Sequence, residues 1–133
     1  MKKIILSFMA IFAICTAAMA QSAPLSVTNN TGCAFLVQLV NSDDACDQMC
    51  ATSAICIPPG TTVINPCNAN WYWDRALITP TTDDCQDCAN GTIFVAAPNP
   101  TNCLGLSTRV RSNHCACGPY RAIFVSPTSL TLN

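Results

Sequence analysis

The stretch CAFLVQLV at Cys33–Val40 is the strongest β-strand signal in this chain of 133 residues. Phe35, Val37 and Leu39 fall on one face of an extended strand, because successive side chains point to opposite sides. The residues between them are also largely apolar, which is typical of a strand buried on both faces. We therefore expect a central strand here, in a fold made of strands.

Similar short β-prone runs follow, separated by Pro, Gly or Asn about every ten residues. The expected strands are 26–28, 33–40, 61–64, 71–78, 92–97, 106–111, 120–125 and 129–132. The pair 106–111 and 120–125 is expected to form a hairpin with a long tip over 112–119. The fold class predicted is all-β: a disulfide-stapled antiparallel β-sandwich of about seven or eight short strands.

One short helix is expected near 43–51. Ser42 is a suitable N-cap, Asp43 and Asp44 suit a helix N-terminus, and Cys46 and Cys50 are spaced for one helical face.

The first twenty residues have the pattern of a secretory signal peptide. Lys2 and Lys3 precede the apolar run 4–14, and Ala18-Met19-Ala20 is a typical cleavage site. A membrane anchor is disfavoured because the run is short, and lipidation at Cys15 is disfavoured because a bulky Ile precedes it. We expect a signal peptide over 1–20 and one mature domain over 21–133, with no transmembrane segment in the mature chain.

Ten cysteines remain after that cleavage, an even number that suits five bridges. They are Cys33, Cys46, Cys50, Cys56, Cys67, Cys85, Cys88, Cys103, Cys115 and Cys117. The pairing cannot be deduced from spacing. This density in a short chain predicts an oxidising location, secreted, at the cell surface or periplasmic.

The predicted mature chain has four arginines, seven aspartates, no lysine and no glutamate, so its side-chain charge is −3. Nucleic acid is an unsuitable partner for such a chain, because phosphate binding needs a basic stripe. No nucleophile motif is present and the carboxylates are all Asp, so we expect no enzyme activity.

Three clusters are interpreted as structural. The spacing Cys85-x-x-Cys88 suits redox chemistry, but neighbouring aspartates disfavour a thiolate. His114 with Cys115 and Cys117 has soft-metal ligands, although oxidised cysteines bind no metal. Asp83, Asp84, Asp87 and Asn90 do not match a calcium loop. No metal or cofactor is expected.

The aromatic strand is the best candidate for binding. Alternation places Trp71, Trp73 and Arg75 on one face, and Tyr72 and Asp74 on the other. Exposed aromatic rings beside charged groups suit sugar recognition. The alternative is that the tryptophans fill the core, which leaves Tyr72 and Asp74 outside, and we favour this alternative.

A second candidate lies on the expected hairpin. Arg109 and Arg111 share one strand face, and Tyr120 is expected across the hairpin from them. Such a group suits a carboxylate or sulfate ligand. Arginines that simply face solvent are the commoner case.

The opening VTNNTGCAFLVQLV, the PPGTT turn and the WDRALI strand together resemble small exported, disulfide-rich β-sandwich proteins of bacteria with no assigned function. The opening also resembles the first strand of thaumatin-like proteins, whose acidic cleft has no counterpart here. The resemblance implies fold and export, and no active site.

These observations favour a non-enzymatic exported structural or cell-surface protein that engages like copies, as an oligomer or polymer, or a surface partner. A weakly charged exterior opposes self-association poorly. Both chain ends are strand-forming and are expected to offer sheet edges. The alternative is a small module that binds cell-surface glycans through residues 71–75.

Overall fold

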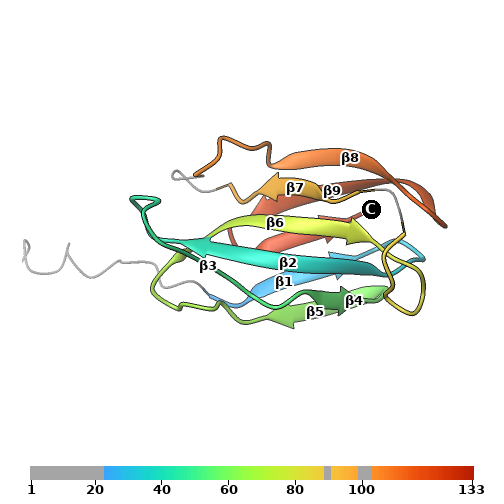
Figure 1. The fold of residues 1–133 in the computed structure, drawn as a ribbon, viewed down its shortest axis with the longest axis horizontal. Coiled ribbons are helices and arrows are strands. Elements are labelled where there is room, and N and C mark those ends of the chain that lie inside the picture. The colour runs from blue at the N-terminus through green and yellow to red at the C-terminus, as the bar shows by residue number, and fades with distance from the viewer. Residues whose placement is uncertain (1–22, 89–90, 99–102) are drawn as a thin grey trace, which may run out of the picture.

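The computed structural model describes residues 23–88, 91–98 and 103–133. These residues form ten strands in two facing sheets, without a helix (Figure 1). Sheet A has the order β5 (Gly60–Ile64), β1 (Leu25–Asn29), β10 (Ser129–Leu132), β9 (Gly118–Ser126) and β8 (Arg109–His114). Sheet B has the order β3 (Met49–Ala51), β2 (Phe35–Ser42), β6 (Tyr72–Pro80) and β7 (Ile93–Ala96), and β4 (Ile55–Ile57) also pairs with β2. The predicted all-β, disulfide-stapled sandwich is confirmed.

The core lies between the two sheets and is built by alternation along each strand. In β2, Phe35, Val37 and Leu39 are fully buried while Leu36 and Gln38 are partly exposed. β1 and β9 of sheet A show the same alternation and supply the opposing layer of the core. β6, which neighbours β2 in sheet B, alternates in the same way. Burial of these side chains stabilises the sandwich by about 1.5–3 kcal/mol for each large residue. The strand that anchored the prediction is therefore central, as expected.

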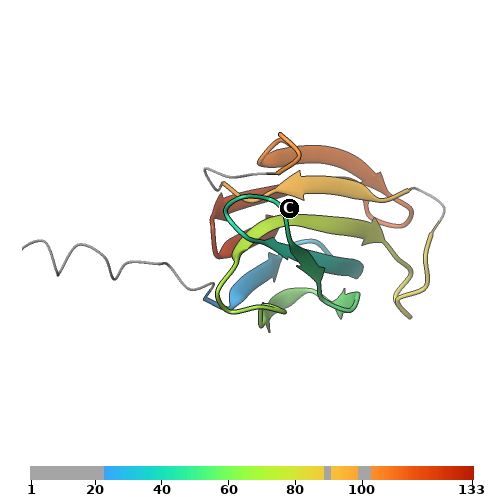
Figure 2. The same cartoon turned by 60° about the vertical axis from the view of Figure 1, so that its left-hand side comes forward.

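The two terminal strands lie inside sheet A. β1 pairs in parallel with β10, and the two are flanked by β5 and β9. The C-terminus accordingly lies within the outline of the sandwich in both views (Figures 1 and 2). The expectation that the chain ends offer edges is wrong, because each satisfies the backbone groups of the other. The edges are β5 and β8 in sheet A, and β7 with β3 and β4 in sheet B.

The helix expected near 43–51 does not form. Asp43 instead closes a tight turn, since its Oδ1 accepts the N–H groups of Asp47 at 2.9 Å and Gln48 at 3.3 Å. Cys46 has a φ of 61°, which a right-handed helix excludes. The chain then enters β3 at Met49. Side-chain capping of the turn competes here with helical hydrogen bonds.

In the hairpin of β8 and β9, β8 begins three residues later than expected, β9 is longer, and the tip is shorter. Only residues 115–117 separate the strands, and Gly118 adopts a φ of 75° at the exit of the turn. His114 holds this tip: its Nδ1 accepts the N–H groups of Ala116 at 3.1 Å and Cys117 at 3.3 Å. Since that nitrogen accepts, Nε2 carries the proton and donates to the Ala34 carbonyl at 3.0 Å.

The ten cysteines among the described residues are all paired, and the bridges join segments that are distant in sequence. The pairs are Cys33–Cys117, Cys46–Cys103, Cys50–Cys67, Cys56–Cys85 and Cys88–Cys115. Cys33–Cys117 connects the start of β2 in sheet B to the hairpin tip of sheet A. Five disulfides in a chain of this size are typical of proteins that fold in an oxidising compartment.

The predicted signal peptide over 1–20 lies outside the described residues. Across 23–88, 91–98 and 103–133, the structure contains no helix with the length and apolar character needed to cross a membrane.

Candidate functional site

The aromatic segment of β6 does not present the expected two faces. Trp73 is only 2% exposed and Asp74 is fully buried, although they are consecutive. The cause is a β-bulge: Val40 pairs with Arg75 and Asn41 pairs with Trp73, so that Asp74 is the extra residue. The prediction that tryptophan fills the core is confirmed for Trp73. The expectation that Asp74 lies outside is wrong.

Burial of Trp73 removes the ring stack on which a sugar site would depend. Its indole Nε1 donates to the Ala23 carbonyl at 2.9 Å and thereby holds the segment before β1. Trp71 and Tyr72 are both half-buried. This strand therefore carries two partly covered rings in place of the exposed platform considered from the sequence.

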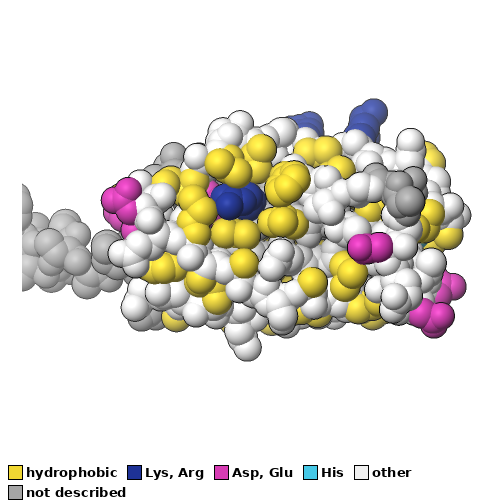
Figure 3. Space-filling model, viewed as in Figure 1, with side chains coloured by type: hydrophobic (Ala, Val, Ile, Leu, Met, Phe, Trp, Pro, Cys, Tyr) yellow, Lys and Arg dark blue, Asp and Glu magenta, His cyan; other side chains and the backbone are white. Residues whose placement is uncertain are grey.

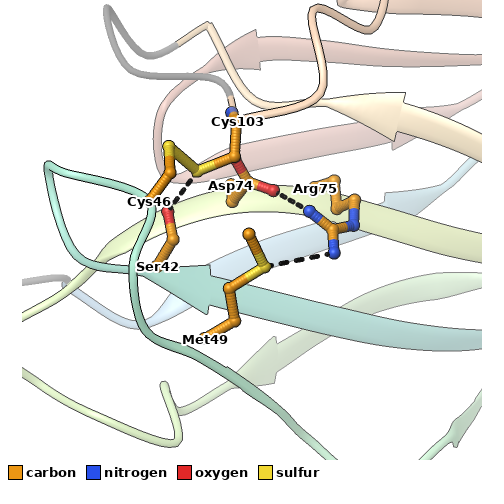
Figure 4. Close-up of polar contacts among 6 residues, drawn as sticks. All are labelled: Ser42, Cys46, Met49, Asp74, Arg75 and Cys103. Carbon is orange, nitrogen blue, oxygen red and sulfur yellow. Dashed lines mark hydrogen bonds and ion pairs between the residues drawn. A yellow bond between two sulfur atoms is a disulfide. The ribbon is translucent and has the colours of Figure 1, made fainter.

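Asp74 is held by two donors at the start of β6. The backbone N–H of Cys103 donates to Oδ1 at 2.7 Å, and the Arg75 guanidinium forms an ion pair with Oδ2 (Figure 4). Arg75 also donates to the Met49 Sδ at 3.4 Å, and its side chain is 15% exposed. Nearby, the Ser42 hydroxyl donates to the Cys103 Sγ at 3.3 Å, since a disulfide sulfur carries no hydrogen. The Asp74–Arg75 ion pair carries no net charge and lies beside the Cys46–Cys103 bridge.

The surface around this ion pair is apolar. Val40 and Ala96 lie directly opposite Arg75 on the neighbouring strands, and Leu77 pairs with Phe94 one step along. Figure 3 shows a basic side chain ringed by hydrophobic side chains over β6 and β7. Phe94 is 46% exposed and Met49 is 42% exposed, both large values for such residues. We call Met49, Val40, Arg75, Leu77 and Phe94 the Arg75 face.

A second surface lies on the outer side of sheet A. Arg109 and Arg111 share the exposed face of β8, as predicted, and Arg121 of β9 pairs directly with Arg111. We call Arg109, Arg111 and Arg121 the arginine cluster. Among the described residues the only ion pair is Arg75–Asp74, so no carboxylate neutralises this cluster.

Tyr120 does not belong to the arginine cluster, which corrects the prediction. It is 3% exposed, and its ring lies 4.8 Å from that of Phe35 in the core. Burial raises the pKa of the Tyr120 phenol, and the nearby Ser112 side chain partly offsets this rise. The hydroxyl is nevertheless buried without a partner in hydrogen-bond geometry, since the Ser112 contact does not satisfy it.

The cysteine clusters are structural. Cys85 pairs with Cys56 and Cys88 pairs with Cys115, so the C-x-x-C segment forms no internal bridge. His114 lies within 4.8 Å of sulfur atoms from two bridges, but those sulfurs are oxidised. Both ring nitrogens of His114 are already in hydrogen bonds. The cluster therefore has no thiolate to offer a metal. Of the acidic cluster, Asp83, Asp84 and Asp87 are exposed, and Asn90 lies outside the described residues.

Sequence reasoning missed Arg121, Met49 and Phe94. A short hairpin tip ending at Gly118 would have placed Arg121 opposite Arg111, because the tip length sets the register. Phe94 lies in the predicted strand 92–97, but nothing local distinguishes its face from that of Val95. Met49 lies in the segment 43–51, where a helix was expected, and it begins β3 instead.

No family model matches this chain, and no curated protein or solved structure shows significant similarity to it.

Proposed function

We propose that this protein is a non-enzymatic, exported structural or cell-surface domain that associates with like copies through the Arg75 face. The observation that carries the proposal is the exposure of Phe94 and Met49 around a neutralised arginine. Exposed apolar patches rimmed by polar residues are typical of protein interfaces, and Met, Phe and Arg are enriched in them.

A second copy is favoured as the partner by charge. Arg75 is the one charged residue of the Arg75 face, and the buried Asp74 carboxylate neutralises it. Two identical faces can therefore approach without repulsion, as a two-fold symmetric interface requires. β7 is the last strand of sheet B and borders this face, and the Ala96 N–H on its outer side donates to the Ser107 carbonyl at 2.9 Å.

The glycan-binding alternative at 71–75 is less supported. Trp73 and Asp74 are buried and engaged within the domain, which leaves Trp71 and Tyr72 as half-buried rings. We keep the alternative as a proposal for those two rings alone.

The test is Phe94→Asp with Val63→Asp as its matched control. Val63 is 65% exposed and lies on β5 of the other sheet, so both changes add one charge at an exposed apolar position. Sedimentation velocity of the oxidised mature protein across concentration should show association that Phe94→Asp weakens by about tenfold or more, equal to about 1.4 kcal/mol. Val63→Asp should leave association unchanged.

Two results would overturn the proposal. One is a wild-type protein that stays monomeric at the highest concentration reached. The other is an equal loss of association in both variants, which would indicate a general effect of added charge.

A further inference from the structure

The arginine cluster is costly as an isolated structural feature. Arg111 and Arg121 are directly opposite each other in an antiparallel pair, where like charges destabilise a sheet. Arg109 lies two residues along the same face. Three of the four arginines in the predicted mature chain are gathered here, although the chain has few charges with which to cover its surface. A bound anion would remove this repulsion.

The surface is hollowed beside the cluster. A depression of about 290 Å³ is lined by Arg111, Pro119, Tyr120, Arg121 and Asn133. A smaller one of about 90 Å³ is lined by Arg109, Val110, Arg111 and Arg121. Arg111 and Arg121 line both depressions. The larger one is at the lower end of the size of small-ligand sites, which is about 300 Å³.

Threonine hydroxyls continue the polar surface from the arginine cluster across the outer face of sheet A. Thr61, Thr28 and Thr131 are neighbours in one row, which continues through Ile123 to Arg109. Hydroxyl groups can donate to and accept from the hydroxyls of a sugar, and guanidinium forks match carboxylates and sulfates. The outer positions of all five strands of sheet A carry no aromatic side chain on which the bases of a single-stranded nucleic acid could stack.

We propose that the outer face of sheet A binds an acidic polysaccharide, with the arginine cluster on its carboxylate or sulfate groups and the threonine row along its sugar hydroxyls. The aspartates do not prevent this. Six of the seven lie in the loops 43–47 and 83–87 of the other sheet, and Asp74 is neutralised by Arg75. None of them forms an ion pair with the cluster within the described residues. This site is independent of the Arg75 face.

The test measures the affinity of the oxidised mature protein for polygalacturonate and heparin, with dextran as the uncharged polymer. We expect binding to one or both acidic polymers at low salt, little to dextran, and an affinity that falls steeply as salt is added. The two acidic polymers distinguish carboxylate from sulfate as the preferred group.

The variant Arg111→Gln/Arg121→Gln should weaken binding about tenfold or more. Arg111→Lys should lose part of the affinity, because lysine keeps the charge but not the bidentate fork. The control is Ser53→Asp, an exposed position between β3 and β4 that changes the net charge by one unit away from the cluster. It should alter affinity less than twofold.

The proposal is overturned if wild-type protein binds neither acidic polymer at low salt, or binds dextran equally. It is also overturned if Ser53→Asp weakens binding as much as one arginine replacement, or if single-stranded DNA alone is bound. A further outcome would overturn the proposal: no polymer binding is seen, and the arginine variants lose self-association. The cluster would then belong to contacts between copies. Retention of polymer binding by Phe94→Asp separates this site from the proposed interface.

Discussion

Tyr120 shows how one buried side chain links packing to pH. Its ring packs against Phe35, and its hydroxyl is buried without a hydrogen bond. Such a group costs about 1–3 kcal/mol relative to a satisfied one. Burial also raises the pKa of the phenol above its ordinary value of 10.0. The residue therefore stabilises the fold through its ring and costs stability through its oxygen.

We predict that Tyr120→Phe raises the unfolding free energy by about 1 kcal/mol near neutral pH, because it removes the unsatisfied hydroxyl. Above about pH 10 the unfolded phenol loses its proton while the folded one keeps it, so wild-type stability falls as pH rises. The variant lacks this contribution, and the gap between the two proteins should widen. Urea titrations from pH 8 to 11 under non-reducing conditions measure this. An identical pH dependence in both proteins would contradict the prediction.

The bulge in β6 shows how an element acquires a property that its strand pattern does not predict. Asp74 is the extra residue of the bulge and is fully buried, and Arg75 and the Cys103 N–H compensate its charge. The ion pair is covered by Met49 and the Cys46–Cys103 bridge (Figure 4). The bulge thus fixes Arg75 at the centre of the Arg75 face.

Breaking this pair should destabilise the domain. Arg75→Gln leaves the buried Asp74 charge with one donor, and we expect the unfolding free energy to fall by about 2 kcal/mol. Combination with Asp74→Asn should recover part of the loss, since the uncompensated charge is then removed. Arg109→Gln, which breaks no ion pair, is the control and should stay within about 0.5 kcal/mol. Guanidinium titrations of the wild type, Arg75→Gln, Asp74→Asn, the double variant and the control give the coupling, and strictly additive losses would refute it.

At the scale of the whole molecule, five bridges join the two sheets and their loops. Cys33–Cys117 closes a loop of 84 residues and links the two sheets. Cys50–Cys67 closes a loop of only 17 residues. A bridge restricts the unfolded chain more when it closes a longer loop. The bridges therefore differ in how much each contributes to stability.

We predict that replacing Cys33 and Cys117 with alanine costs more than replacing Cys50 and Cys67. Loop entropy gives a difference of about 1.4 kcal/mol, which is an upper bound because the remaining bridges shorten the loop that Cys33–Cys117 closes. Denaturation of the two double variants, with the other four bridges verified by peptide mapping, measures the difference. A larger loss on removal of Cys50–Cys67 would contradict the prediction.

The sequence by itself determined the all-β class and the central position of the strand predicted over 33–40, and it favoured a core position for Trp73. These follow from local alternation, since a strand's period of two decides which side chains can share a core. It also determined that the cysteines would be disulfide-bonded rather than catalytic or metal-binding. The reason is composition, because ten cysteines in a short chain indicate a disulfide scaffold.

Only the tertiary structure decided the disulfide pairing, the place of the chain ends and the make-up of both surfaces. The β1–β10 pairing joins residues about a hundred positions apart, and no local pattern encodes such a contact. A single extra residue buries Asp74, and the tip of three residues sets Arg121, and not Tyr120, beside Arg111. One-residue shifts in register exchange the two faces of a strand, so the candidate sites depended on contacts that form only when the sheets assemble.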